Sequence, residues 1–233
     1  MDCTEHITER KVLFDGGSRW SGNWQTAANR SVGGTSHSYL ETYPHLLQTE
    51  YHGWVDRLSV DNSAFAAVHT MGTDKQWDLT GYDAIELKLG PTDGKLYHIV
   101  IHDGRPFSWV GSFRGLLAAS DRVIRFHRLI PMRMPLRNQP GHEDPPPLNL
   151  GNIRGFGIYI LNSDASQDGA FTLRILSISA VKLPCSCPTV PDPISMAIEN
   201  RGGRILEMRA RARLVIQSMR AAIRTILRRK PEK

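Results

Sequence analysis

The chain has 233 residues and a hydrophobic content of 40%, enough to build one sizeable core with about 50 residues to spare. Its formal net charge is +6, but residues 182–233 hold 12 of the 29 basic and only 4 of the 23 acidic residues. That segment therefore carries a net charge of +8 and residues 1–181 carry −2. This distribution excludes a strongly basic body, and we expect no nucleic-acid partner.

The amino-terminal arm, residues 1–11, contains three acidic residues and no apolar run. It therefore predicts neither a secretory signal nor an acid-poor mitochondrial presequence. No stretch of the chain approaches the roughly 20 apolar residues of a membrane-spanning helix. All three cysteines lie outside residues 12–181, which predicts a domain without disulfides in a reducing compartment. Cytoplasm is the expected location.

Residues 12–181 consist of short alternating or β-branched runs separated by glycine and proline. This pattern predicts a sandwich or barrel of antiparallel strands. The predicted strands are Val55–Val60, Ala64–Met71, Ala84–Leu89, Leu96–His102, Arg122–Leu129, Gly155–Leu161 and Ala170–Ile178. We expect Gly34, Gly81 and the Asp93-Gly94 pair to occupy turns or close approaches that disfavour a β-carbon. The last of these pairs predicts a hairpin.

Several motifs occur in a distinctive order along this domain. They are Arg30–Leu40 with its Gly33-Gly34 pair, Trp77–Lys88 (WDLTGYDAIELK), Asp93–Tyr97 (DGKLY), Ile124–Arg133, Pro147–Ile158 and Gly169–Ile178. Together they resemble the complex I intermediate-associated protein 30 domain across some 170 residues. The resemblance implies a jelly-roll β-sandwich similar to galactose-binding-like and carbohydrate-binding modules. It also implies assembly of respiratory complex I, and hence an association with mitochondria.

One strand carries the candidate ligand site. In Leu96–His102 the side chains of Tyr97, Ile99 and Ile101 alternate with those of His98, Val100 and His102. We assign the first set to the core, and the second either to solvent-facing surface or to the lining of a groove. The neighbouring residues Arg105, Trp109 and His127 are expected to contribute to such a lining. We expect Trp109 to be the most exposed aromatic side chain and Trp77 to lie in the core.

No cofactor or metal is predicted. The Cα atoms of His98 and His102 should lie roughly 13 Å apart along one strand, too far to share one zinc ion. The sequence also contains no nucleophile elbow and no spacing that demands a carboxylate pair. Enzymatic activity therefore stays open, and no catalytic residue is assigned.

The period of the pattern changes after the domain. Residues 182–202 contain four prolines and Cys185-Ser-Cys187, which predicts an extended linker. In residues 203–230 an apolar stripe recurs at helical spacing opposite a row of arginines, which predicts a basic amphipathic helix. Packing on its own sandwich, contact with an anionic membrane surface and insertion into a partner's groove are the alternatives.

Two function hypotheses follow. The first is a non-catalytic, chaperone-like binding or assembly factor with a protein partner. The second is a small-molecule-binding protein of a biosynthetic pathway, of the isomerase or cyclase type, that uses a groove bordered by residues 103–121. A deep, partly apolar site at His98, His102 or Trp109 would favour the second hypothesis.

Overall fold

The structure is a computed structural model. It describes residues 7–16, 24–29, 34–56, 64–70, 76–91, 93–105, 107–114, 120–133, 146–161 and 165–184. Nearly all of the predicted linker, the predicted tail helix and residues 57–60 of the first predicted strand lie outside these ranges.

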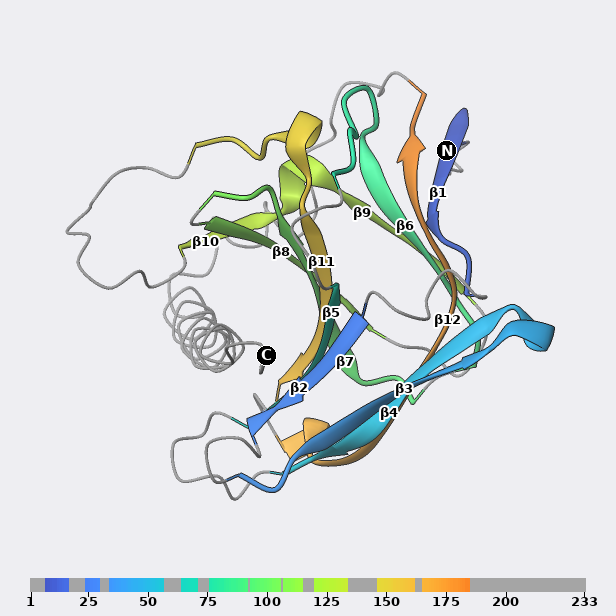
Figure 1. The fold of residues 1–233 in the computed structure, drawn as a ribbon, viewed down its shortest axis with the longest axis vertical. Coiled ribbons are helices and arrows are strands. Elements are labelled where there is room, and N and C mark those ends of the chain that lie inside the picture. Colours follow the sequence, from blue (N-terminus) through green and yellow to red (C-terminus); the bar gives the residue numbers. More distant parts are fainter. Residues whose placement is uncertain are drawn as a thin grey trace, which may run out of the picture.

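Two antiparallel sheets pack face to face (Figure 1). The first sheet has the order β3-β4-β12-β6-β9, with β1 also paired to β12. Its strands are β1 (Glu9–Phe14), β3 (His37–Tyr43), β4 (Gln48–Val55), β6 (Ala84–Leu89), β9 (Ser120–Arg125) and β12 (Gly169–Lys182). The predicted β-sandwich is confirmed.

The second sheet has the order β10-β8-β7-β11-β5-β2. Its strands are β2 (Trp24–Ala28), β5 (Phe65–Thr70), β7 (Leu96–His102), β8 (Phe107–Arg114), β10 (Ile130–Arg133) and β11 (Gly155–Leu161). Short 3-10 turns are η3 (Pro44–Leu46), η4 (Phe126–Arg128), η5 (Leu150–Asn152) and η6 (Ala165–Gln167). Among the described residues, no helix is long and apolar enough to cross a membrane.

The core lies between the two sheets and uses alternate residues of each strand. Tyr97, Ile99 and Ile101 of β7 belong to it, as predicted, and meet residues such as Phe171 of β12. Trp77 packs against the same core and contacts the rings of Phe14 and Phe156. Burying these apolar side chains is the main source of the sandwich's stability.

The Asp93-Gly94 turn is not a hairpin, because β6 and β7 belong to different sheets. Gly94 has a φ of 75°, which confirms the predicted positive φ. The turn leads from one sheet to the other and is held in place by Asp93. The Asp93 carboxylate accepts hydrogen bonds from the Tyr97 hydroxyl at 2.9 Å and from the Thr172 amide at 2.6 Å. A local sequence signal of this kind predicts the turn itself, but it does not predict which strand pairs with the strand that follows.

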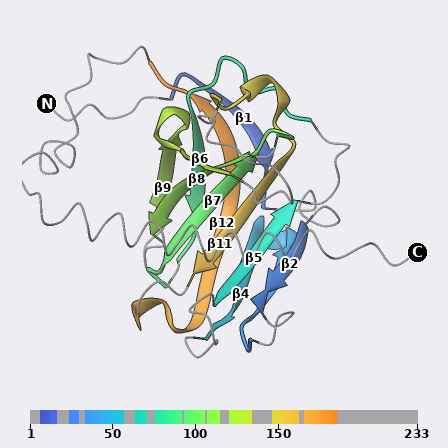
Figure 2. The same ribbon diagram turned by 90° about the vertical axis from the view of Figure 1, so that its left-hand side faces the viewer.

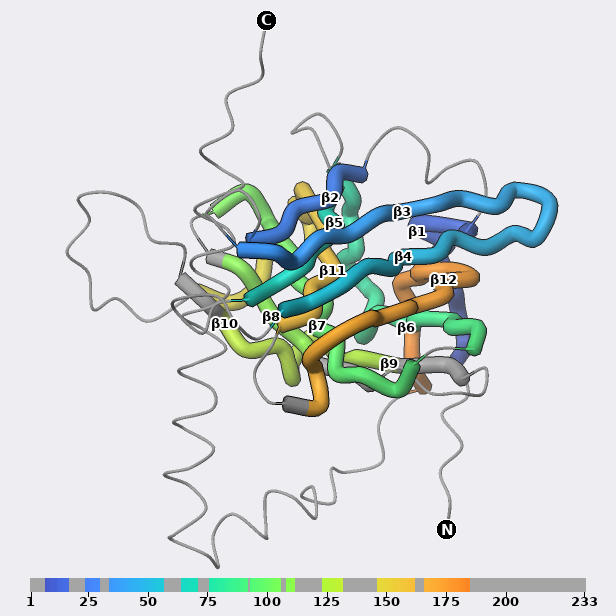
Figure 3. The backbone as a smooth tube through the Cα atoms, turned by 90° about the horizontal axis from the view of Figure 1, so that it is seen from below, coloured from blue at the N-terminus to red at the C-terminus, as the bar shows by residue number. Residues whose placement is uncertain are grey.

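The β3–β4 hairpin projects beyond the rest of the sandwich (Figure 3). It ends in η3 and in Leu47, a non-glycine residue with a φ of 48°. Close packing at its base needs glycine at position 53, where a β-carbon would lie 2.1 Å from the His37 carbonyl oxygen. Similarly, a β-carbon on Gly34 would lie 2.2 Å from the Asn29 side chain, which confirms the predicted close approach.

Candidate functional site

The candidate site lies on the face of the second sheet that points away from the first sheet. On β7 this outer face carries His98, Val100 and His102, because their neighbours Ile99 and Ile101 belong to the core. His98 is 2% exposed and Val100 is 0% exposed. The solvent-facing alternative is therefore wrong for these two side chains, whereas His102 at the end of the strand is partly exposed.

Neighbouring strands add further side chains to the same face. Register pairs His98 with Tyr159 of β11, and Tyr159 in turn with Ala67 of β5. His69 of β5 lies opposite Gly157, and Ser108 of β8 lies opposite His102. We call this surface the histidine face and define it by Ala67, His69, His98, Val100, His102, Ser108 and Tyr159, with Gly155 and Gly157 between them.

The two glycines of β11 make room for the rings around them. A β-carbon on Gly157 would lie 2.7 Å from Cε2 of Tyr159, so the tyrosine ring leans over this glycine. A β-carbon on Gly155 would lie 3.7 Å from the His102 ring. Because neither position carries a side chain, the imidazoles and the phenol lie close to the backbone of the central strand.

Replacing Gly157 with alanine is expected to lower the free energy of unfolding by about 1–3 kcal/mol, as overpacking typically does. The new methyl group must displace the Tyr159 ring, which is buried. Urea denaturation measures the loss, and Gly151→Ala is the matched control, because the nearest contact of its β-carbon would be an ordinary 3.4 Å. Equal stability of the two variants would show that the ring moves without cost.

Burial sets the charge state of the face. It lowers the pKa of His98 from 6.5 to about 4, and it lowers the pKa of His69 to about 4 as well. The pKa of His102 is also lowered to about 4, first by burial and then by the neighbouring His69, against the opposing charge of Asp103. Three neutral imidazoles therefore share this face at pH 7.

Neutral imidazoles can each donate and accept a hydrogen bond. His102 already uses Nδ1, which lies 3.1 Å from the Ser108 hydroxyl. The face thus combines an apolar floor with a few polar groups, the composition of a site for a small ligand or an apolar segment. Within the described residues no group of three or more His, Cys, Asp or Glu side chains could hold a metal ion.

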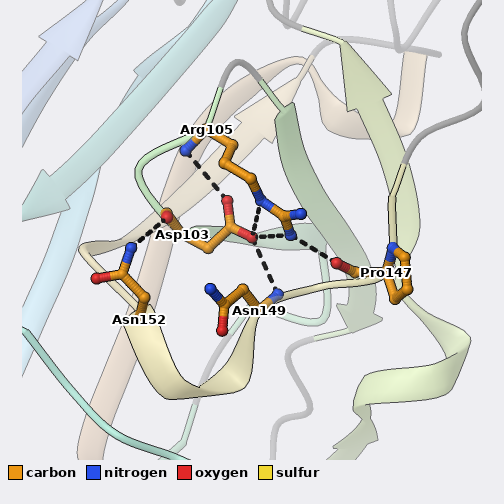
Figure 4. Close-up of polar contacts among 5 residues, drawn as sticks. All are labelled: Asp103, Arg105, Pro147, Asn149 and Asn152. Atoms are coloured by element: carbon orange, nitrogen blue, oxygen red, sulfur yellow. Dashed lines mark hydrogen bonds and ion pairs between the residues drawn. The ribbon is translucent and has the colours of Figure 1, made fainter.

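Asp103 and Arg105 form a separate polar network at the end of β7 (Figure 4). Asp103 is fully buried, and its Oδ2 accepts hydrogen bonds from Arg105 Nε at 2.8 Å, from Arg105 Nη2 and from the Asn149 amide at 3.0 Å. Asn152 Nδ2 donates to the Asp103 carbonyl at 3.0 Å, and Arg105 Nη2 also donates to the Pro147 carbonyl at 2.5 Å. The network fixes the β7–β8 turn against the segment that leads into β11.

Trp109 is not exposed, contrary to the sequence-based expectation. It lies on β8 opposite Ile101, faces the core and is 4% exposed. The Arg105 guanidinium lies over its ring at 5.3 Å from the centroid, an arrangement that favours both groups. Arg105 and Trp109 therefore support the end of β7 rather than lining the histidine face.

His127 lies apart from the other candidates. It is an exposed residue of η4, the turn that carries the chain from β9 in the first sheet to β10 in the second. The structure thus brings together His98 and His102 and adds His69, Ser108 and Tyr159, which the sequence reasoning missed. The alternation Gly155-Phe-Gly157-Ile-Tyr159 was the available signal, since it places two glycines and a tyrosine on one face.

Comparison with known proteins gives a family match. The sequence model of the complex I intermediate-associated protein 30 (CIA30) family matches residues 13–175. The uncharacterized protein C9E9.15 of Schizosaccharomyces pombe is 25% identical over 186 residues, which cover 73% of this chain and 83% of that protein.

Solved structures with a similar fold include carbohydrate-binding modules. The family 11 module of the cellulosomal cellulase Lic26A-Cel5E of Clostridium thermocellum is 14% identical, with a TM-score of 0.49 and coverage of 79% of this chain and 100% of that one. The agarase AgWH50C is 10% identical, with a TM-score of 0.48 and coverage of 77% and 25%.

Proposed function

Because the chain belongs to the complex I intermediate-associated protein 30 family, we propose that it is a non-catalytic assembly factor that holds a protein partner on the pathway to respiratory complex I. Family membership supports a binding or assembly type of function. The partner, the link to complex I and the mitochondrial association that it entails are parts of the proposal. The observation that carries it is the surface of the β3–β4 hairpin.

This hairpin presents large apolar side chains to solvent. Leu46 and Leu47 at its tip are 55% and 66% exposed, and Tyr39 and Trp54 on its outer face are 52% and 46% exposed. The centroids of the Tyr39 and His52 rings lie 5.6 Å apart, so the imidazole borders the exposed aromatic surface. Exposed aromatic and aliphatic groups gathered on one projecting element are typical of protein-binding surfaces.

The hairpin also presents a backbone edge with which no described strand pairs. β3 lies at the end of its sheet and pairs with β4 alone among the strands of the two sheet orders. An edge strand can accept one further strand from a partner, while the side chains beside it supply specificity. Tip, face and edge therefore form one surface suited to a polypeptide.

Co-purification from the native cell tests this proposal. The tagged full chain is compared with a Tyr39→Ser/Trp54→Ser variant, and complex I subunits are quantified against biosynthetic enzymes. We expect recovery of complex I intermediates by the wild type and a loss of about thirtyfold in affinity in the variant, the effect of removing an interface hot spot.

Ile130→Ser is the matched control, since Ile130 is 62% exposed but lies on β10 at the edge of the other sheet. It should retain the partner. Undiminished recovery by the hairpin variant, or recovery of biosynthetic enzymes alone, would refute the proposal.

The histidine face supports a second candidate, a small-molecule-binding protein of the isomerase or cyclase type. The specific observation is the gathering of neutral His69, His98 and His102 beside Tyr159 in an apolar setting. Titration of the full chain with small apolar compounds, followed through the histidine ring resonances, distinguishes the two candidates. Selective shifts of these rings would favour the second.

A further inference from the structure

Most of the histidine face is buried, with His69 and His102 partly exposed, although no described element packs on it. Tyr159 and His98 are each 2% exposed, and Val100 is 0% exposed. In Figure 2 the second sheet turns this face towards the viewer, and among the described helices and strands none lies in front of it. Side chains on a bare sheet face would be exposed, so this burial calls for a cover that the described elements do not supply.

These exposures are those of a single chain, which favours a cover from the same chain over one from a partner. The segments outside the described residues and within the sandwich are short. The longest, residues 134–145, contains Pro135, Pro140 and Pro145, which exclude a helix through it. None of these short segments offers an apolar stripe long enough to span the sheet.

The carboxyl-terminal segment does offer such a stripe. Its apolar positions are Ile205, Met208, Ala212, Val215, Met219 and Ile223, followed by Ile226. From first to last they would extend about 32 Å along a helix at 1.5 Å per residue. Six strands at a spacing of about 4.8 Å are about 24 Å wide, so the stripe can cross the whole sheet.

We propose that residues 203–230 fold as an amphipathic helix and pack their apolar stripe on the histidine face of the same chain. The connection is long enough, since β12 ends at Lys182 and an extended segment to residue 203 spans up to about 70 Å. With the apolar stripe facing the sheet, Arg213, Arg220 and Arg224 lie on the solvent side of the helix.

Chemical modification of the full chain tests the proposal. Diethyl pyrocarbonate reacts with accessible imidazoles, and the exposed His127 serves as an internal reference. In the native chain His98 should react at least about tenfold more slowly than His127, and a Val215→Asp/Met219→Asp variant should abolish this protection by releasing the helix. The control Arg213→Glu/Arg220→Glu alters the polar side and should preserve the protection.

A photo-crosslinking residue at position 215 or 219 provides a second measurement that does not depend on the stability of the aspartate variant. We expect crosslinks to β7 or β11 in a product of monomeric mass, and none from position 213. Crosslinked dimers would overturn the proposal, because they would place a second copy of the chain on the face. So would the absence of any crosslink to the second sheet. His98 as reactive as His127 in the native chain would also overturn it, and is expected if the stripe binds membranes instead.

Discussion

Replacing Asp103 with alanine is expected to lower the free energy of unfolding by about 3 kcal/mol, the scale on which breaking a buried ion pair destabilises proteins. The Asp103 carboxylate is fully buried and accepts hydrogen bonds from Arg105 and from the Asn149 amide. Alanine would leave the amides of Arg105 and Asn149 without this acceptor and the guanidinium without its counter-ion. Equilibrium unfolding in urea measures the loss as a lower midpoint.

Asp78→Ala is the matched control for this substitution. Both aspartates accept a hydrogen bond from the amide two residues ahead, at 2.8 Å for Asp78 and 3.2 Å for Asp103, but Asp78 is exposed. The control should therefore cost less than about 1 kcal/mol, because water replaces the lost acceptor. Equal losses in the two variants would contradict a special role for the buried network.

A double-mutant cycle separates the ion pair from the backbone contacts. Arg105→Ala in the Asp103→Ala background should cost much less than Arg105→Ala alone, because its main acceptor is already gone. Additive losses would instead show that the two residues act independently. The network matters for the candidate site because Asp103 follows His102 directly and holds the end of β7 in place.

The strands that sequence reasoning placed correctly are those with a strong apolar pattern. β6, β7 and β11 begin and end at the predicted residues, because each is an unbroken apolar or alternating run bounded by turn residues. β3 and β4 were missed almost entirely. In these strands buried positions include the polar residues Ser38 and Thr49, whereas outward positions include aromatic and charged residues. A pattern of hydrophobic residues alone therefore does not predict these strands.

The candidate site shows a similar division between local and nonlocal information. The common direction of His98 and His102 follows from the two-residue period of a strand and was predictable. The approach of His69 was not, because it depends on which strands pair, and neither was the burial of His98, because it depends on contacts between segments distant in sequence. Trp109 was misplaced because the sequence around it reads as a loop, whereas register with β7 turns it to the core.

The buried histidines should make the protein sensitive to acid. The pKa of His98 is about 4 in the folded state and 6.5 in the unfolded chain, so between these values the unfolded state binds more protons. Stability is therefore complete above pH 6.5 and falls as the pH is lowered towards 4. At about 1.4 kcal/mol per pKa unit, His98 alone accounts for a loss of about 3 kcal/mol, and His102 and His69 act in the same direction.

Urea unfolding at pH 7 and pH 4.5 measures this dependence, and substitution identifies its source. His98→Leu should make the pH profile less steep, whatever it does to stability at pH 7, because the variant gains one proton fewer on unfolding while His69 and His102 still contribute. His127→Gln is the control, since that side chain is exposed and lies away from the histidine face, and it should leave the slope as it is. An unchanged slope in His98→Leu would mean that His98 is already charged in the folded protein, and the histidine face would then have to be open to water.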